Sequence, residues 1–406
     1  MTSSSPLVTY DDVVVARELI RDVVRVTPVE GSRPLGAAVG GPVHLKCENL
    51  QRTGSFKIRG AYVRIARLDA RQRAAGVVAA SAGNHAQGVA LAADLLGTKT
   101  TIFMPEGAAL PKVEATRAYG ADVQLAGATV DEALVAAEDY ATAHGCVLVH
   151  PFDHPDIIAG QGTVGLEFLE QVPDLRTVVV PVGGGGLISG IAAVMREAGR
   201  DIAVVGIQAE GAACYPPSLA AGRPVALSSF ATMADGIAVG RPGELTFPHI
   251  ETLVHDVHTV SDEDISRALL LCLERAKLLV EPAGAAGVAA VLADPSAFEP
   301  PVGVVLSGGN ADPLLLLRVL RHGLIAAGRY LSFRLRIPDR PGELARLLEI
   351  LAATQANVLD VEHLRTGPKL HLDEVEVALQ METRGPDHCV EVLDRLRDAG
   401  YPLLFG

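Results

Sequence analysis

The strongest constraint on the fold is an alternation of short apolar runs with longer stretches rich in alanine and leucine. The runs contain many β-branched residues and fall between about residues 77 and 320. They are VVAAS (77–81), TTIFMP (100–105), TVVVPV (177–182), AVVGI (203–207) and VGVVLS (302–307). Near-continuous apolar strands separated by helices predict an α/β fold with parallel sheets that helices cover on both faces. Ligands of such sheets bind at the carboxyl ends of the strands, in the loops that lead into the next helix.

Length and charge narrow the kind of protein. At 406 residues the chain is too long for one ordinary core, and two or three domains are expected. A net charge of -13 argues against non-specific binding to nucleic acid or anionic membrane, and no apolar run is long enough to span a membrane. The N-terminal MTSSSPLVTYDD lacks a secretory signal, and five scattered cysteines without a CxxC pair fit reduced thiols. We therefore expect a cytoplasmic protein that binds small molecules and neither nucleic acid nor membrane.

A region with a different pattern begins near residue 331. LSFRLRI alternates as a strand does, DRPGE places a proline and an acid at a helix start, and NVLDVEHLR and DEVEVALQME indicate two further strands. YPLLF closes the chain. Apolar residues at helical spacing are Leu344, Leu347, Leu348 and Leu351 in one stretch and Cys389, Leu393 and Leu396 in another. The order β-α-β-β-α-β over residues 331–406 predicts a small ferredoxin-like domain without a catalytic constellation of its own.

A run of four glycines at residues 183–186 (GGGG, the glycine loop) lies between a buried strand and a helix start. Glycine lets backbone N–H groups turn toward a ligand, and a helix N-terminus carries partial positive charge, so this place suits a phosphate. No GK[ST] sequence follows the run, and no matching acidic residue supports a dinucleotide site. A flexible turn is the alternative, but the strand before the loop and the helix after it favour a phosphate site.

Two further loops follow predicted strands. The SAGNH loop (residues 81–85) offers backbone N–H groups, the Ser81 hydroxyl and the Asn84 amide, which could hold a carboxylate. A capped helix start is an equally good interpretation, and a histidine such as His85, taken alone, more often packs or caps than catalyses. The SGGN loop (residues 307–310) offers the Ser307 hydroxyl, although an ordinary turn is the better interpretation of this loop in isolation.

One lysine stands out in TGSFKIRG (residues 53–60), between a phenylalanine and glycines. A lysine is most often a solvated surface charge, and its amine reacts near neutral pH only when it is desolvated or held near other cations. Phe56, Gly54 and Gly60 around Lys57 are compatible with partial burial. Such a lysine together with a phosphate loop favours pyridoxal phosphate (PLP), which needs a lysine, a phosphate cradle and a partner for its ring nitrogen.

Five motifs in order carry a resemblance to a known family. HLKCENLQRTGSFKIRGA, SAGNHAQGVA, PVGGGGLISG, MADGIAVGRPG and LSGGN resemble the motifs of the fold-type II PLP enzymes, and in particular of the threonine dehydratases (threonine ammonia-lyases). The likeness runs from about residue 10 to 325. It implies a catalytic domain over residues 1–325, built on two open sheets, with a smaller subdomain inserted at about residues 50–150. The tail, residues 331–406, resembles the regulatory ACT domain, which in this family binds a branched-chain amino acid such as isoleucine or valine.

The same resemblance implies roles for individual residues. Lys57 would bind the cofactor covalently and act as the catalytic base, with Phe56 packed near the ring. Asn84 would bond the ring hydroxyl, and Ser307 would meet the pyridine nitrogen. The phosphate would be held by Gly183, Gly184, Gly185 and Gly186. The substrate carboxylate would be received by Ser81, Ala82, Gly83, Asn84 and His85, and Gly236 and Glu281 would lie close to the cofactor.

The residue opposite the ring nitrogen bears on the reaction. A serine cannot keep that nitrogen protonated as a carboxylate would, so the ring is a weaker electron sink and prompt expulsion of a β-leaving group is favoured over transamination. Together with the resemblance to the threonine dehydratases, this implies dehydration and deamination of L-threonine to 2-oxobutanoate and ammonia, with L-serine giving pyruvate as a side activity.

Several alternatives stay open. Serine racemases share these motifs but carry a second serine where this chain has Ala82. These racemases also have a cation site, of which this chain retains Glu210, whereas Cys214 and Pro216 stand where further ligands would be expected. No metal site is therefore predicted. Another hydroxy-amino-acid dehydratase, or a non-enzymatic amino-acid sensor, are further interpretations. The tail could bind an effector or only pair subunits. A homotetramer or homodimer is expected from the family likeness, and the role could be isoleucine biosynthesis or amino-acid breakdown.

Overall fold

The computed structural model describes residues 7–365 and 370–404. The chain forms two compact units that divide between Leu316 and Leu317. This division falls inside helix α14 (Pro313–Ala326). The first unit holds two sheets and the second holds one.

The larger sheet of the first unit has six strands in the order β1-β2-β10-β7-β8-β9. Its neighbours pair in parallel except at one edge, where β1 runs antiparallel to β2. The strands are β1 (Val29–Gly31), β2 (Val43–Lys46), β10 (Val302–Val305), β7 (Thr177–Pro181), β8 (Ala203–Ala209) and β9 (Asp256–Val260). The predicted parallel sheet is therefore confirmed, and its antiparallel edge is an addition that the sequence pattern did not indicate.

Alternate residues of β7 point to opposite faces of this sheet, and both faces are apolar. Val178 and Val180 belong to a core with α8 (Pro155–Gln171) and α9 (Gly186–Arg196), here called the large-sheet core. On the other face, α13 (Pro282–Ala293) packs on the sheet. The remaining helices of this part are α1 (Tyr10–Ile20), α2 (Arg33–Val39), α10 (Tyr215–Ala221), α11 (Thr246–Leu253) and α12 (Asp262–Leu271).

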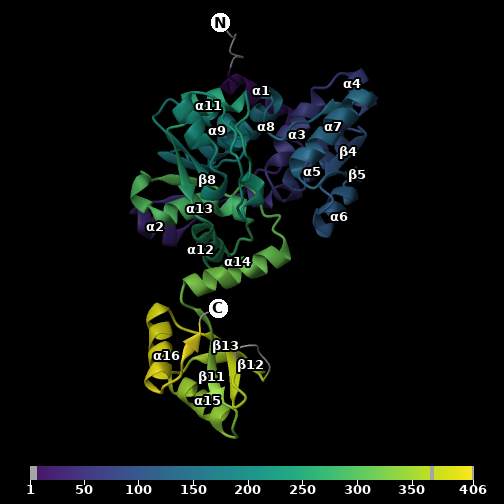
Figure 1. Ribbon diagram of the computed structural model, residues 1–406. Helices are drawn as coiled ribbons and strands as arrows, with labels where there is room; N and C mark the ends of the chain where they lie inside the picture. The colour runs from purple at the N-terminus through teal and green to yellow at the C-terminus, as the bar shows by residue number, and fades with distance from the viewer. Residues whose placement is uncertain (1–6, 366–369, 405–406) are drawn as a thin grey trace. The chain divides into compact units, whose positions relative to one another are not determined.

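The smaller sheet has four parallel strands in the order β5-β4-β3-β6. They are β5 (Asp122–Leu125), β4 (Thr100–Met104), β3 (Val77–Ala80) and β6 (Val147–Leu148), and Figure 1 shows β4 and β5 beside α5, α6 and α7. Val77 and Ala79 face the helices α3 (Lys57–Ala66) and α5 (Asn84–Leu95), in what we call the small-sheet core. Val78 and Ala80 face α7 (Val130–His144). Helices α4 (Ala70–Ala75) and α6 (Leu110–Ala118) complete this part.

The second unit has the predicted order β-α-β-β-α-β. Its elements are β11 (Tyr330–Pro338), α15 (Glu343–Ala353), β12 (Asn357–Leu364), β13 (Glu374–Glu382), α16 (Pro386–Asp398) and β14 (Leu403–Leu404). The strands form an antiparallel sheet in the order β12-β13-β11-β14. Phe333, Leu335 and Ile337 alternate inward from β11 and pack with Leu347 and Leu351 of α15. The ferredoxin-like arrangement follows from this alternation.

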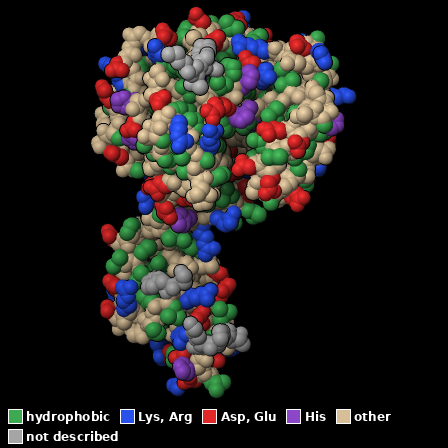
Figure 2. Space-filling model, turned by 45° about the horizontal axis from the view of Figure 1, so that its top comes forward, with side chains coloured by type: hydrophobic (Ala, Val, Ile, Leu, Met, Phe, Trp, Pro, Cys, Tyr) green, Lys and Arg blue, Asp and Glu red, His purple; other side chains and the backbone are tan. Residues whose placement is uncertain are grey.

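The surface carries charges of both signs. On the face drawn in Figure 2, blue Lys and Arg side chains are scattered among red Asp and Glu side chains. Within residues 7–365 and 370–404, no helix is both long and apolar enough to cross a membrane.

Candidate active site

A cavity of about 950 Å³ lies in the first unit where loops from both of its sheets meet. The SAGNH loop follows β3 of the smaller sheet, whereas the glycine loop follows β7 and Ser307 follows β10 of the larger one. The structure brings together every residue that the sequence singled out for the site. The cavity is lined by Phe56, Lys57, Ser81, Ala82, Gly83, Asn84, His85, Gly183, Gly184, Gly185, Gly186, Gly236, Glu281 and Ser307. Their individual roles stay predictions.

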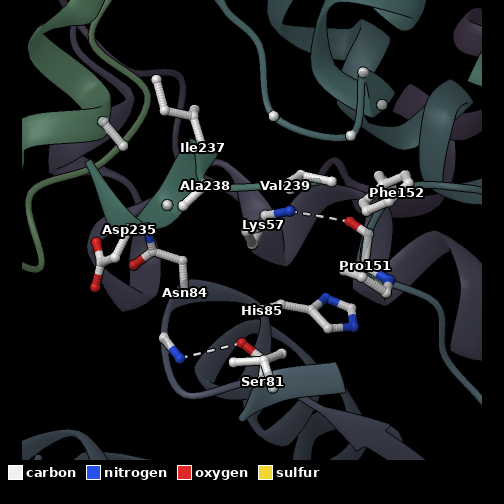
Figure 3. A pocket seen from close by; sticks show the side chains of 18 of the residues that line it. Lys57, Ser81, Asn84, His85, Pro151, Phe152, Asp235, Ile237, Ala238 and Val239 are labelled. Carbon is white, nitrogen blue, oxygen red and sulfur yellow. Dashed lines mark hydrogen bonds between the residues drawn. The ribbon is translucent and has the colours of Figure 1, made fainter. Parts of the chain in front are cut away.

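Lys57 is the first residue of α3, and its amine projects into the cavity (Figure 3). Its Nζ donates a hydrogen bond to the Pro151 carbonyl at 3.0 Å and lies 5.1 Å from the centre of the Phe56 ring. The segment before it is fixed to the SGGN loop, because Phe56 N–H donates to the Ser307 carbonyl and Ser55 forms a β-bridge with Gly308. Burial lowers the pKa of Lys57 to about 8, against the opposing effect of the Glu281 carboxylate. The amine is therefore available in its neutral, nucleophilic form near neutral pH.

This lowered pKa predicts the pH dependence of Lys57 reactivity. Because only the neutral amine is nucleophilic, the rate at which Lys57 of the PLP-free protein reacts with trinitrobenzenesulfonate should rise with pH, with a midpoint near 8. Peptide mass spectrometry after timed labelling at a series of pH values measures this rate residue by residue. Lys99 is exposed and provides a reference amine in the same samples. A Lys57 profile that follows that of Lys99 would contradict the prediction.

The glycine loop has the geometry of an anion cradle. It leads into α9 and includes Gly185, whose φ of 99° is left-handed. The Gly184 carbonyl accepts hydrogen bonds from Thr246 Oγ1 at 2.6 Å and from the Tyr215 hydroxyl at 3.1 Å. Since C=O and N–H of one trans peptide point in opposite directions, the Gly185 N–H points away from these two side chains. The loop thus places a backbone donor, the Gly185 N–H, at the N-terminus of α9, a position that suits an anion.

Close packing explains why this loop consists of glycines. A Cβ at Gly184 would lie 2.3 Å from the Phe152 ring, and a Cβ at Gly185 would lie 2.3 Å from the Tyr215 hydroxyl. Real Cβ atoms do not approach other atoms this closely. Larger residues would therefore displace Phe152 or Tyr215 and with them the backbone donors.

The SAGNH loop offers main-chain donors more than side-chain ones. The Ser81 hydroxyl accepts from Gly83 N–H at 3.1 Å, and Asn84 begins α5, whose first-turn N–H groups have no partner within the helix. His85 Nε2 contacts the Val149 carbonyl at 2.8 Å, which requires the proton on Nε2 because a carbonyl only accepts. Burial and the nearby Lys57 lower the pKa of His85 to about 3, so its ring is neutral. We therefore expect His85 to meet a carboxylate through its backbone N–H and not through its ring.

Glu281 lies beside Asn84, and Gly236 lies beside Glu281. Asn84 Nδ2 donates to Glu281 Oε1 at 2.6 Å, and a Cβ at Gly236 would lie 3.5 Å from the same oxygen. Burial, followed by the charge of Asp235, raises the pKa of Glu281 to about 7. Ser307 is buried at the end of β10 and presents an uncharged hydroxyl to the cavity. The cavity lining therefore includes an ionisable carboxyl next to Asn84 and a neutral hydroxyl at Ser307.

Sequence reasoning missed several residues of the site. Pro151 supplies the carbonyl that binds Lys57, and Phe152 packs against the glycine loop. Both follow β6, and the sequence HPFD at that strand end is the signal that could have revealed them. Lys112 of α6 and Asp235 form an ion pair of 2.7 Å, and both line the cavity. Asn310 was likewise unassigned, although it completes the SGGN loop.

A buried ion network lies next to the helix that carries Lys57. Arg59 binds Glu48 through two nitrogens at 2.8 Å each, and it binds Glu167 at 2.7 and 3.0 Å. Lys46 Nζ also binds Glu167, at 2.7 Å. All four side chains are at most 7% exposed. Two cations and two carboxylates are thus mutually neutralised, and they tie α3 to α8 and to the end of β2.

The arrangement fits PLP on the residues themselves. The fit rests on a lysine with a lowered pKa, a glycine loop in which a Cβ at Gly184 or Gly185 would clash, and a neutral hydroxyl in a cavity of sufficient size. Glu210, which the resemblance matches to a cation ligand of the racemases, begins a short helix (Glu210–Ala212), and Cys214, which stands where another ligand would be expected, is buried. Among the described residues, no group of three or more His, Cys, Asp or Glu side chains could hold a metal ion.

Comparison with known proteins agrees with this geometry. Residues 20–308 match the family described as pyridoxal-phosphate dependent enzymes. The chain is 45% identical to the L-threonine ammonia-lyase of Thermotoga maritima over 395 residues, which is 97% of this chain and 98% of that protein. Among solved structures, the processed form of threonine deaminase isoform 2 from Solanum lycopersicum superposes with a TM-score of 0.73 at 35% identity, covering 79% of this chain and 96% of that one. Maize serine racemase superposes with a TM-score of 0.74 at 38% identity, covering 79% and 99%.

The chain therefore belongs to the pyridoxal-phosphate dependent enzyme family, in its fold-type II branch, and PLP is its cofactor. The resemblance drawn from the five sequence motifs is confirmed.

Proposed function

We propose that this protein is a threonine ammonia-lyase, which converts L-threonine to 2-oxobutanoate and ammonia and L-serine to pyruvate. The observation that carries the proposal is the Lys57 amine, held at 3.0 Å from the Pro151 carbonyl inside the cavity with its pKa lowered by burial to about 8. A base with such a pKa takes a proton effectively near neutral pH. The names of the relatives at 45% identity support the choice of threonine.

Within the proposal, each loop of the cavity has one task. When bound, PLP supplies the electron sink that makes the α-proton of an amino acid acidic. Lys57 Nζ takes this proton and holds it. The glycine loop binds the anionic end of the cofactor through backbone N–H groups, and the SAGNH loop binds the substrate carboxylate through the free N–H groups at the start of α5. Ser307 contributes a neutral hydroxyl, which leaves the sink weak and favours early loss of the β-hydroxyl.

A ketoacid assay tests the proposal. The purified PLP-bound protein should release 2-oxobutanoate from L-threonine and pyruvate from L-serine, each with an equal amount of ammonia. Coupled oxidation of a reduced nicotinamide by a ketoacid dehydrogenase measures the ketoacid, and glutamate dehydrogenase measures the ammonia. Protein that shows the cofactor absorbance yet releases no ketoacid from either amino acid would overturn the proposal.

Chiral chromatography of the serine reactions separates dehydration from racemisation. We expect D-serine to be a minor product, because Ala82 has no hydroxyl that could protonate the second face of the α-carbon. Ala82 lines the same cavity as Lys57. D-serine formed faster than pyruvate would favour the racemase alternative, which the similarity to maize serine racemase keeps open as a second function.

We further propose that the second unit binds isoleucine or valine and that the protein is a homotetramer or homodimer. The βαββαβ order of this unit supports the first part, since it is the arrangement that the ACT-like sequence pattern predicts. A shift of the threonine saturation curve by either amino acid, compared with alanine as a control, tests effector binding. Light scattering on the same samples gives the oligomeric state. The unpaired state of all five cysteines supports a cytoplasmic location.

A further inference from the structure

Three loops that are distant in sequence meet at the side chain of Asn84. Asn84 Oδ1 accepts a hydrogen bond from Asn310 Nδ2 at 2.7 Å. On its other side, Asn84 Nδ2 donates to Glu281 Oε1 at 2.6 Å. One residue of the SAGNH loop is therefore held between the SGGN loop and the residue before α13.

The chemistry of the partners fixes which way the Asn84 amide points. Asn310 Nδ2 also donates to the Thr53 carbonyl at 2.6 Å, and a carbonyl only accepts. Both N–H bonds of Asn310 are thus used, one toward Thr53 and one toward Asn84. The atom of Asn84 that faces Asn310 must be an acceptor, and the atom that faces Glu281 must be its donor. An inverted amide would lose both hydrogen bonds.

Glycines on both sides make room for this arrangement. A Cβ at Gly54 would lie 2.4 Å from Asn310 Oδ1, and Gly54 has a left-handed φ of 71°. A Cβ at Gly308 would lie 2.3 Å from Glu281 Oε1 and 3.0 Å from Asn84 Nδ2. Gly54, three residues before Lys57, and Gly308, directly after Ser307, therefore make room for the polar side chains that meet at Asn84.

We propose that Asn310 and Glu281 are positioning residues that fix the Asn84 amide so that its one remaining N–H, and never its carbonyl, is presented to the cavity. Two N–H bonds belong to Asn84 Nδ2, and Glu281 takes one of them. Asn84 lines the same cavity as Lys57, so the other N–H would have an acceptor on the bound molecule as its partner (Figure 3). The proposal rests on the PLP site described above, where the ring oxygen is such an acceptor. The proposal assigns a function to Asn310, a residue that has no step in the proposed reaction.

Variants at the two positioning residues test the proposal through PLP binding, independently of turnover. Asn310→Ala and Asn310→Asp remove the donors that hold Asn84 Oδ1, and Glu281→Leu removes the acceptor of Asn84 Nδ2. Glu281→Gln keeps an oxygen acceptor without the charge. We expect the first three variants to raise the dissociation constant of PLP at least about tenfold, whereas Glu281→Gln stays within about threefold of the wild type. Equilibrium dialysis of PLP against the PLP-free full-length chain gives these constants.

The absorbance of bound PLP provides the second readout. A hydrogen-bond donor on the ring oxygen lowers its affinity for protons, so loss of the fixed N–H should raise the pH midpoint of the absorbance change in the first three variants. Thr177→Val is the matched control, because it removes one partly buried hydrogen bond, to the Glu299 carbonyl, at the start of β7. It should lower thermal stability without changing the PLP constant or the midpoint.

Two results would overturn the proposal. One is an Asn310→Ala protein with the PLP constant and absorbance midpoint of the wild type. The other is equal loss of PLP binding in Glu281→Gln and Glu281→Leu, which would assign the effect to the charge. Failure of the proposed reaction is distinguishable from either, since a wild type that binds PLP but releases no ketoacid leaves the binding comparison intact.

Discussion

Replacing Lys57 with alanine should lower ketoacid release by roughly 10⁴-fold or more, the contribution expected of a nucleophile that also serves as the base. Among the described residues that line the cavity, the other lysine is Lys112, and its amine is engaged by Asp235 at 2.7 Å. No second amine is therefore placed to take over. Lys57→Arg keeps the positive charge but not an accessible neutral form, so it should be as inactive as alanine. A ketoacid assay and an absorbance spectrum of each purified variant measure the effect.

Lys99→Ala controls for the loss of a lysine as such. This residue is exposed on the same unit, and its replacement should leave activity and spectrum unchanged. Activity of Lys57→Ala above about one hundredth of the wild type would contradict the assignment of Lys57 as both covalent anchor and base.

Arg59→Met should lower the free energy of unfolding of the first unit by about 3–5 kcal/mol, since it leaves buried carboxylates without their guanidinium. Glu48 loses its ion-pair partner entirely and retains the Thr27 hydroxyl, whereas Glu167 retains Lys46. Urea unfolding followed by far-ultraviolet circular dichroism measures the change, a suitable method because the chain has no tryptophan. PLP affinity should fall as well, because Arg59 lies in the same helix as Lys57.

A second substitution separates the unpaired charge from lost packing. The single change leaves the buried Glu48 carboxylate without a cation. Combining Arg59→Met with Glu48→Gln replaces that carboxylate by a neutral amide and should recover part of the lost stability. Arg397→Met, at an exposed pair with Asp394 in the second unit, is the surface control and should change stability by less than about 1 kcal/mol. An Arg59→Met protein as stable as Arg397→Met would show that the buried ion network does not stabilise the first unit.

Much of the fold was predictable because its strands are short, apolar and separated by helices. The run VVAAS became β3 and TVVVPV became β7, each within a residue or two of its expected end. The antiparallel edge formed by β1 was not predictable, because Val29–Gly31 is a three-residue strand with no alternating pattern. In the second unit, Pro341 indicated the helix start, but α15 begins at Glu343 after Gly342 adopts a φ of 93°. A proline near a helix start marks the region and not the first residue.

The residues of the candidate site likewise fall into those that the sequence predicted and those that it did not. Lys57, the SAGNH loop and the glycine loop could be found because each has an unusual composition at a strand end or helix start. Pro151 and Phe152 were missed, because one contributes a backbone carbonyl and the other a ring packed against glycine. The HPFD sequence at the end of β6 indicates a loop position but neither of these contributions. The hydrogen bonds among Asn84, Asn310 and Glu281 join positions up to 226 residues apart, so only the folded chain reveals them.

The two ends of the cofactor site belong to different cores. Ile58 follows Lys57 in α3 and packs in the small-sheet core, whereas Leu187 follows the glycine loop and packs in the large-sheet core. With the roles proposed for these residues, a cofactor bonded to Lys57 at one end and bound by the glycine loop at the other would act as a cross-link between the two cores. Loss of PLP would then abolish activity and also remove this link between the two cores, so that cellular proteases would open both of them more easily.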